Sequence, residues 1–363
     1  MDKRIAVIGT GAIGSALGGQ LTRAGHDVAM IDQWPPHVDA MKRDGLHVII
    51  GERDTPEVEY TVPVRAHHVF EVCTIHDPFD IVFVTCKSYD TEWMARLMEP
   101  HLQRDGVMVS VQNSLNTEWI APIVGPERTM GAVLLGGGEL LEPGFVWRNR
   151  PVLHRYYKVG EPGGGETTRL REMTALLADA GTTEVTQNLS GTQWSKLVLN
   201  CVSAALSALV DPRRRSWDLI RDPEYARHSI AIYREGITVG IAAGYRSEPL
   251  FGMTAEDLLG STDDVFARLI VENSEGHSKT AINMVQQDLF RGRPTEVTGY
   301  FNGLVSRKGR EAGIPTPFND AVTALYQRLE RGEIKQEMAN LGRLDELLGR
   351  ESGIVAEPVA PPA

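Results

Sequence analysis

The sequence predicts an α/β domain with a doubly wound, mostly parallel sheet over residues 1–187, followed by an all-helical domain over 188–349 and a disordered tail over 350–363. Two patterns support this division. Short apolar strands alternate with helical segments in the first half, which is typical of a parallel sheet with helical crossovers. From Gly191 onward the apolar residues recur with a helical period instead.

The N-terminal stretch is the strongest local signal. The apolar run Ile5 to Ile8 predicts a buried strand, and it is followed by G-x-G-x-x-G and a helix ending near Gly25. The run His26 to Ile31 predicts a second strand that ends at Asp32, where an acid holds a ribose diol. We therefore predict a dinucleotide-binding domain whose ligand contacts Asp32 and the turn residues Gly9, Thr10, Gly11, Ala12, Ile13 and Gly14. The alternative is a glycine turn that binds nothing.

The remaining elements of the first domain follow in order along the chain. Leu46 to Val72 alternates in a β-type pattern and predicts strands or a hairpin on the flank of the sheet. Polar residues follow several of the later strands, at the edge where open parallel sheets bind ligands. We predict strands at Asp80–Thr85, Gly106–Val111, Arg128–Leu135, Tyr156–Gly160 and Thr182–Val185, and helices at His37–Asp44, Asp90–Leu102 and Thr167–Ala180.

Composition excludes several classes of function. A net charge of −11 disfavours a nucleic-acid partner, because phosphate binding needs a basic face. The longest late apolar run, Leu197 to Val210, contains Asn200 and is too short to cross a bilayer, so we predict no membrane partner and a cytoplasmic location. The cysteines Cys73, Cys86 and Cys201 are far apart, which predicts buried thiols and no metal site. A homodimer stays open, since sequence does not set the oligomeric state.

The helical domain carries two candidates for chemistry. Its predicted helices are Thr192–Val210, Glu224–Ala243, Thr262–Ser274, Lys279–Arg291, Thr295–Glu311 and Phe318–Arg331. Lys196 and Asn200 lie one turn apart on the first helix, and a lysine on a buried helix needs a partner, a wet cleft or a lowered pKa. Glu296 is placed in the first turn of a later helix. Each residue also has a structural explanation. Lys196 could extend its ammonium to the surface, Asn200 could hydrogen-bond a neighbouring backbone group, and Glu296 could cap its helix.

Taken together, the motifs resemble the ketopantoate reductase (2-dehydropantoate 2-reductase) family from Ile5 to about Arg331, with a D-2-hydroxyacid dehydrogenase as a possible variant. The resemblance implies an N-terminal Rossmann domain, a helical C-terminal domain and an active site between them. It implies that Lys196 donates a proton, that Glu296 supports the substrate, and that Asn113 and Asn200 line the site. It is carried by Gly9-Thr-Gly-Ala-Ile-Gly14, Lys87, Gln112-Asn113 with Glu118, Trp194-Ser-Lys196-Leu with Asn200, Gln287-Asp288, Arg293-Pro-Thr-Glu296, Asn302-Gly303 and Gly313-Ile-Pro-Thr-Pro317.

The cofactor prediction comes from a departure from the family pattern. The family commonly has arginine just after the second strand to hold the 2′-phosphate of NADP, whereas this chain has Asp32 followed by Gln33. A carboxylate repels that phosphate and accepts hydrogen bonds from a free diol, so we predict NAD over NADP. Lys87 is a further predicted cofactor residue that can touch a phosphate, as is Asn113.

Other departures concern the substrate. The family's Gln-Asn-Gly-Leu-Gly becomes Gln112-Asn113-Ser114-Leu115-Asn116, which makes Ser114 a candidate substrate residue. An asparagine of the family is Ala204 here, and the serine that grips the substrate carboxylate is Met284. These changes predict a small oxo or hydroxy substrate bulkier or more apolar than ketopantoate. Asn283 and Ser203, each one residue away, would restore the polarity if the helical register were shifted.

Three functions therefore compete at this point. The first is an NAD-dependent oxidoreductase that interconverts a 2-oxo acid or ketone with its 2-hydroxy counterpart, with Lys196 beside the carbonyl as the proton donor. The second is an authentic NADPH-dependent 2-dehydropantoate 2-reductase of pantothenate biosynthesis. The third is a sensor of NAD(P) without catalysis, which the presence of both Lys196 and Glu296 disfavours.

Overall fold

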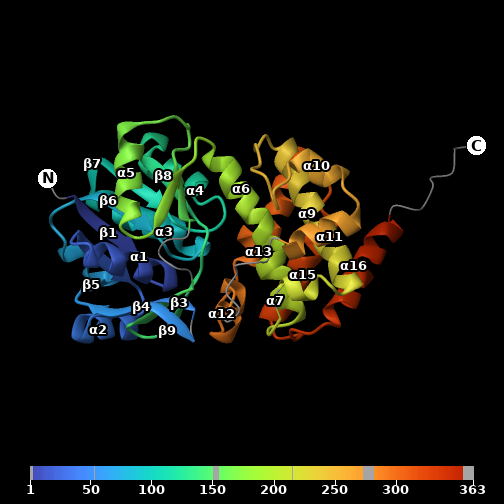
Figure 1. Ribbon diagram of the computed structural model, residues 1–363, viewed down its shortest axis with the longest axis horizontal. Coiled ribbons are helices and arrows are strands. Elements are labelled where there is room, and N and C mark those ends of the chain that lie inside the picture. The colour runs from blue at the N-terminus through green and yellow to red at the C-terminus, as the bar shows by residue number, and fades with distance from the viewer. Residues whose placement is uncertain (1–2, 53, 150–154, 215, 273–281, 355–363) are drawn as a thin grey trace, which may run out of the picture. The chain divides into compact units, whose positions relative to one another are not determined.

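The structure is a computed structural model that describes residues 3–52, 54–149, 155–214, 216–272 and 282–354 (Figure 1). Its residues form two compact units. The first extends as far as Gln193 and includes Ile282, and the second begins at Trp194. The boundary falls inside one helix, α6 (Leu189–Asn200). Among the described residues, no helix has the length and apolarity needed to span a membrane.

The first unit is built on a main sheet in which eight strands are described. Their order is β12-β11-β8-β7-β6-β1-β2-β5, and the six from β8 to β5 are mutually parallel, while β11 is antiparallel to β8. The neighbours β6 and β1 mark the point where the strand order reverses, which is where open sheets bind ligands. The strands are β1 (Arg4–Ile8), β2 (Asp27–Asp32), β5 (Arg65–His68), β6 (Phe79–Val84), β7 (Leu102–Ser110), β8 (Thr129–Leu134), β11 (Arg155–Gly160) and β12 (Thr182–Val185).

Alternation along β1 distributes its side chains between two cores. Ile5 and Val7 belong to a cluster that includes residues of α1, whereas Ala6 and Ile8 pack with residues of α3 and α4. Helices thus cover both faces, which explains why the strand is apolar throughout. The helices and short turns of this unit are α1 (Ala12–Arg23), α2 (Pro35–Asp44), η1 (Val69–Thr74), η2 (Ser88–Asp90), α3 (Thr91–Met98), η3 (Glu99–His101), α4 (Thr117–Val124), η4 (Pro126–Arg128) and α5 (Thr168–Ala178).

A smaller sheet covers the other side of α1. Its order is β4-β3-β10-β9, formed by β3 (Leu46–Glu52), β4 (Thr55–Val62), β9 (Gly138–Glu142) and β10 (Phe145–Arg148). Two glycines of α1 mark its contacts with both sheets. A Cβ on Gly18 would lie 3.0 Å from the Met30 side chain of β2, and one on Gly19 would lie 2.8 Å from Leu46 of β3. The helix is therefore packed between two sheets.

The regular elements described in the second unit are helices, joined by loops that include an isolated β-bridge between Leu250 and Met253. Its longest described helix, α9, begins at Pro223 after Asp222, whose side chain caps the helix by accepting from the backbone N–H groups of Glu224 and Tyr225. Its elements are the end of α6, the π-helical segment η5 (Cys201–Leu206), α7 (Ser207–Val210), α8 (Ser216–Leu219), α9 (Pro223–Ala242), α10 (Ala255–Gly260), α11 (Asp263–Glu272), α12 (Met284–Phe290), α13 (Val297–Tyr300), α14 (Asn302–Ala312), α15 (Pro317–Glu330) and α16 (Asn340–Ile354).

This architecture confirms the predicted fold class and corrects details. The predicted hairpin is present as β3 and β4, but it lies in the smaller sheet, whose partners β9 and β10 the sequence analysis did not predict. The helix predicted over Thr295–Glu311 breaks at Phe301, in a segment whose two glycines weaken a helix. The tail predicted from residue 350 is wrong as far as Ile354, because α16 extends to that residue. Residues 355–363, and those of the predicted helices within 273–281, lie outside the described residues.

Candidate active site

The glycine turn after β1 contains glycines of two kinds. Gly9 has a φ of +84°, and a Cβ there would lie 2.6 Å from the Cys86 backbone. A Cβ on Gly14 would lie 2.4 Å from Thr85 Oγ1 and 2.7 Å from the Gly9 carbonyl oxygen. At Gly11 a Cβ would meet no atom within 4 Å, so the packing of the chain does not require glycine. Open space at the N-terminus of α1 is what a pyrophosphate needs in order to reach backbone N–H groups.

Buried polar contacts hold this turn in place. Thr85 Oγ1, at the end of β6, donates to the carbonyl oxygens of Ile8 (3.0 Å) and Gly9 (2.9 Å). Ser15 Oγ donates to the Thr10 carbonyl at 2.7 Å and lies 3.0 Å from His37 Nε2. Since His37 Nδ1 accepts from a backbone N–H, the ring proton lies on Nε2 and is donated to Ser15 Oγ. These hydrogen bonds fix the conformation of the turn that carries Thr10, Ala12 and Ile13.

Asp32 is the last residue of β2 and is buried. Its Oδ1 accepts from the backbone N–H of Trp34 at 2.8 Å, and its Oδ2 accepts from Thr10 Oγ1 at 3.3 Å. The carboxylate is therefore oriented by the glycine turn itself. With the open approach at Gly11, this arrangement fits the pyrophosphate and ribose of a dinucleotide.

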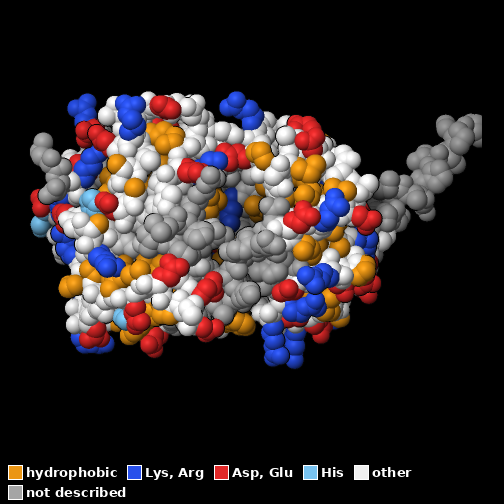
Figure 2. All heavy atoms as spheres, in the orientation of Figure 1, with side chains coloured by type: hydrophobic (Ala, Val, Ile, Leu, Met, Phe, Trp, Pro, Cys, Tyr) orange, Lys and Arg blue, Asp and Glu red, His pale blue; other side chains and the backbone are white. Residues whose placement is uncertain are grey.

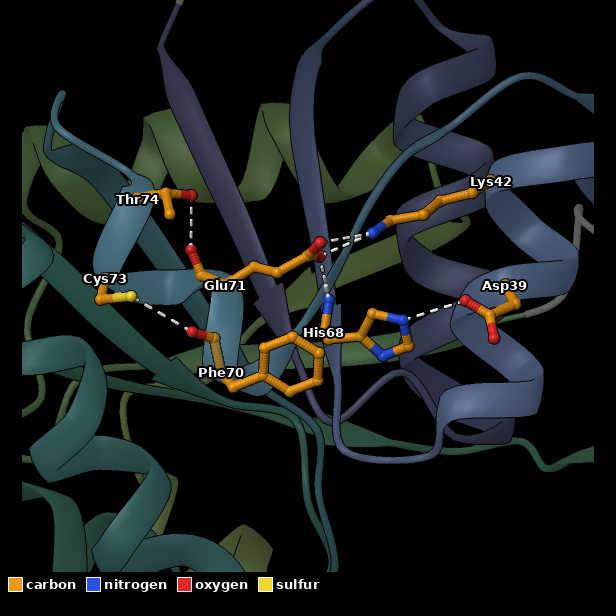
Figure 3. A network of polar contacts seen from close by, with 7 residues as sticks. All are labelled: Asp39, Lys42, His68, Phe70, Glu71, Cys73 and Thr74. Carbon is orange, nitrogen blue, oxygen red and sulfur yellow. Dashed lines mark hydrogen bonds and ion pairs between the residues drawn. The ribbon is translucent and has the colours of Figure 1, made fainter.

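The edge of the sheet beside Asp32 is fixed by a second network (Figure 3). In β5, His68 pairs in register with Asp32, and its Nε2 lies 3.0 Å from Asp39 Oδ1 of α2. Glu71 of η1 accepts from the His68 backbone N–H and from Lys42 Nζ of α2, each at 2.7 Å. The lysine lowers the pKa of the Glu71 carboxyl. These contacts attach η1 and α2 to the edge strand next to Asp32.

The loops after β6 and β7 are tied together by a residue that the sequence analysis did not select. Asn116 is fully buried, and its Nδ2 donates to the Asn113 carbonyl at 2.6 Å and to Ser88 Oγ at 2.9 Å. Its Oδ1 accepts from Thr91 Oγ1 at 2.6 Å. The departure from the family's glycine at this position was the available signal. Asn113 itself is half-buried, and Lys87 precedes η2 at the same edge of the sheet.

Ser114 stands in a left-handed backbone conformation, with a φ of +72°, and it is buried. This conformation favours glycine, the residue found in the family's version of the motif. A serine here stores backbone strain beside Asn113.

In the second unit, Lys196 and Asn200 occupy α6 as predicted. Trp194 and Leu197 are buried around a half-buried Lys196, and Trp194 Nε1 donates to the Gly236 carbonyl of α9 at 3.0 Å. A Cβ on Gly240 would lie 2.2 Å from Trp194 Nε1, so α6 and α9 approach closely. Asn200 is buried at the point where α6 passes into the π-helical segment η5.

Side chains from distant helices bind the carbonyls of η5 and α7. Tyr326 donates its hydroxyl to the Ala205 carbonyl at 2.7 Å, and Asn340 Nδ2 donates to that of Leu209 at 2.8 Å. Asn302 Nδ2 lies 3.5 Å from the Cys201 carbonyl and donates to Asn319 Oδ1 at 2.9 Å. A π-helical turn widens the helix and often marks functional sites. Here it directly follows Asn200.

Asn319 connects this segment to a buried carboxylate on α9. Glu235 accepts from the backbone N–H groups of Phe318 (2.8 Å) and Asn319 (2.9 Å), and from Asn319 Nδ2 at 2.7 Å. It thereby caps the N-terminus of α15. Burial raises the pKa of Glu235 to about 7, against the lowering effect of these donors.

The other predicted residues of the second unit occupy helix starts. Glu296 is buried and directly precedes α13; it makes no side-chain cap of that helix, so the capping alternative does not explain it. Its neighbour Thr295 is held by Glu330, whose Oε1 accepts from the Thr295 backbone N–H at 2.9 Å. Met284 is half-buried and opens α12, which Asn283 caps by accepting from the Gln286 N–H.

Ser203 and Asn283, the polar residues next to Ala204 and Met284, already make hydrogen bonds with the backbone. Ser203 Oγ donates to the Leu199 carbonyl at 2.8 Å, while Ala204 is buried in η5. Asn283 Oδ1 is used by the α12 cap at 3.0 Å. Among the described residues, no group of three or more His, Cys, Asp or Glu side chains is arranged to hold a metal ion. On the face drawn in Figure 2, acidic and basic side chains are interspersed.

Comparison with known proteins covers most of the chain. A family model described as "Ketopantoate reductase PanE/ApbA" matches residues 5–162, and its C-terminal counterpart matches residues 188–330. The 2-dehydropantoate 2-reductase of Pyrococcus horikoshii is 26% identical over 337 residues, covering 90% of this chain and 97% of the relative.

Similar solved structures also cover most of the chain. A PanE/ApbA family ketopantoate reductase from Ralstonia eutropha JMP134 is 27% identical with a TM-score of 0.73, covering 91% of this chain and 99% of that one. A ternary structure of D-mandelate dehydrogenase with NADH and anilino(oxo)acetate has a TM-score of 0.74 at 20% identity, covering 95% and 99% of the two chains. At that identity the second match shows a common fold.

Proposed function

The chain belongs to the ketopantoate reductase family of NAD(P)-dependent oxidoreductases, and we propose that it uses NAD to interconvert a 2-oxo acid or related ketone with its 2-hydroxy counterpart. The observation that carries the cofactor preference is Asp32. Its buried carboxylate lies at the end of β2, oriented by Thr10 and the Trp34 backbone, and Gln33 follows it. A carboxylate in this place accepts from a ribose diol and repels a 2′-phosphate.

The chain's own residues supply the remaining chemistry. The nicotinamide, when bound, provides the hydride. Lys196 stabilises the negative charge that develops on the carbonyl oxygen and donates its Nζ proton to that oxygen. Glu296 supports the substrate, and Asn113 and Asn200 position it. Two properties support these roles: Lys196 is half-buried on an apolar helix, and Glu296 is a buried carboxylate that makes no side-chain cap of α13.

The substrate is proposed to be bulkier or more apolar than ketopantoate. Met284 and Ala204 stand where the family has polar groups, and the adjacent Asn283 and Ser203 already bond to the backbone. Ser114 is proposed to contact the substrate next to Asn113. A pocket that lacks a hydrogen-bonding partner discriminates against a polar substrate, whereas an apolar pocket accepts a larger side chain at little cost.

The test is an absorbance assay of NADH and NADPH oxidation with ketopantoate and a panel of aliphatic and aromatic 2-oxo acids, followed by the reverse reaction with the matching 2-hydroxy acids. We expect kcat/KM to be at least about tenfold higher with NADH than with NADPH, and higher for an apolar 2-oxo acid than for ketopantoate. Turnover of ketopantoate with NADPH as the best pair would refute both preferences.

That outcome would establish the second candidate, a 2-dehydropantoate 2-reductase of pantothenate biosynthesis. The activity named for the relatives favours it, since those aligned over nearly the whole chain carry this name. The two candidates share Lys196 and Glu296, so only the substrate and cofactor panel separates them.

A further inference from the structure

Gln33 and Asp90 join two loops at the cofactor edge of the first unit. Gln33 follows β2, and its Nε2 donates to Asp90 Oδ2 at 3.1 Å. Asp90 ends η2 in the loop after β6, and its Oδ1 accepts from Trp93 Nε1 at 2.7 Å. The Asp90 carboxylate is therefore held by two side-chain donors on either side of it.

The strand order places this pair around the glycine turn. Within the sheet, β1 lies between β6 and β2. The loop that contains Asp90 follows the carboxyl end of β6, and the loop that contains Gln33 follows the carboxyl end of β2. A dinucleotide on the glycine turn presents its adenosine ribose to Asp32. A 2′-phosphate on that ribose would meet Asp32, the side chain of residue 33, and the carboxylate attached to it.

We propose that Asp90 is a second determinant of cofactor choice, whose carboxylate repels a 2′-phosphate and fixes the side chain at position 33. This rests on the proposed preference for NAD. A consequence follows for any arginine placed at position 33. Such a guanidinium would pair with Asp90 in the way that Gln33 does, so its charge would be neutralised before it could hold a phosphate. Lys87, three residues before Asp90, is the opposing group, because its ammonium attracts phosphate.

The experiment measures the Kd of NADH and of NADPH for the full chain by nucleotide fluorescence, without substrate, for the wild type and the variants D90N, Q33R and Q33R/D90N. The amide introduced by D90N keeps an oxygen that accepts from Trp93, and its NH2 group donates to Gln33 Oε1 once the Gln33 amide turns over, so both contacts are kept while the charge is removed. The control is D77N, which removes the same charge from a side chain that is 84% exposed and lies before β6, at the opposite end of that strand.

We expect D90N to bind NADPH about fivefold more tightly while NADH changes less than about twofold, as for removal of one partly exposed charge close to a doubly charged phosphate. Q33R alone should gain less than about threefold for NADPH, whereas Q33R/D90N should gain about fiftyfold, more than the product of the single effects. D77N should leave both constants unchanged. Equal NADPH affinity of D90N and wild type, or a Q33R gain that D90N does not enlarge, would overturn the proposal.

A measurement on the wild type needs no variant and covers the case in which D90N does not fold. The ratio of the NADPH to the NADH Kd should fall as ionic strength rises from about 0.05 to 0.5 M, because salt screens the repulsion. A ratio that rises with salt would show that Lys87 dominates and would overturn the role of Asp90. A wild type that binds NADPH more tightly at low salt would refute the preference for NAD itself, and D90N would still test Asp90 separately.

Discussion

Two turns of the backbone position the candidate residues, and they are stabilised in different ways. The glycine turn after β1 is shaped by backbone that leaves no room for a side chain at Gly9 or Gly14. The π-helical segment after Asn200 contains no such constraint from glycine and is held by Tyr326 and other side chains more than a hundred residues away in sequence. A turn of the first kind can be recognised from the spacing of three residues, whereas one of the second kind requires the complete fold.

The largest expected effect is that of Lys196→Ala, which should reduce turnover without weakening NADH binding. Lys196→Ala should lower kcat about a thousandfold, because the proposed proton donor and its charge are both lost, while the Kd of NADH stays within about twofold. Steady-state kinetics and fluorescence titration measure the two quantities. Lys335→Ala, at an exposed lysine of the same unit, is the control and should change neither. Unaltered turnover in Lys196→Ala would remove the catalytic assignment.

Next in size is a difference between two glycines of one turn. Gly14→Ala should destabilise the fold by about 2–3 kcal/mol, since the added Cβ would overlap Thr85 Oγ1 and the Gly9 carbonyl. Gly11→Ala should cost less than about 1 kcal/mol but weaken NADH binding at least about tenfold, because the methyl group fills the approach to the backbone. Urea denaturation and NADH titration give both values. If Gly11→Ala binds NADH normally, the cofactor does not approach there.

A pH titration tests Glu235, the buried carboxylate that is connected to η5 through Asn319 and Asn302. Because burial raises the pKa of Glu235 to about 7, above its ordinary 4.5, the folded chain keeps this proton longer than the unfolded chain. Its contribution to stability is complete below pH 4.5 and is lost as pH rises through 7. Between pH 4.5 and 8, the free energy of unfolding of Glu235→Gln should therefore rise by about 2–3 kcal/mol relative to wild type, measured by urea denaturation at each pH. A constant difference would contradict the raised pKa.

A matched pair of tyrosines tests the carbonyl contacts of η5. Tyr326→Phe should destabilise the chain by about 1–2 kcal/mol, since the buried Ala205 carbonyl loses its donor. Tyr157→Phe is the control, because its buried hydroxyl has no hydrogen-bond partner among the described residues, and the change should be neutral or slightly stabilising. Thermal denaturation of both variants decides this. Equal losses would mean that packing of the ring, rather than the hydroxyl, matters at position 326.

The smallest effect concerns the strain at Ser114. Because Ser114→Gly and Ser114→Ala both remove the hydroxyl, the difference between them reports the left-handed backbone alone. The glycine variant should be more stable by about 1 kcal/mol in urea denaturation. A more stable alanine variant would show that the backbone can relax at this residue without cost.

The same contrast explains what sequence alone could predict. The strand, glycine turn and Asp32 followed from local spacing, because buried parallel strands and tight turns restrict residue type at each position. The smaller sheet could not be predicted, since β3 pairs with β10 across about a hundred residues of intervening chain. Asn116 was missed although its departure from the family's glycine was visible, because its partners Ser88 and Thr91 become its neighbours only in the folded sheet. The π-helical turn was missed because its side-chain partners lie more than a hundred residues away in sequence. The roles of Lys196 and Glu296 stay predictions.

The position of α1 between two sheets has a consequence for biosynthesis. Gly18 and Gly19 allow both sheets to approach, but each lowers the intrinsic stability of the helix by about 1 kcal/mol relative to alanine. A helix of twelve residues with this composition does not persist alone in water. The helix therefore settles only once β10, which contacts it and ends at Arg148, is also in place, so the nucleotide cradle is completed by a strand encoded more than a hundred residues after it.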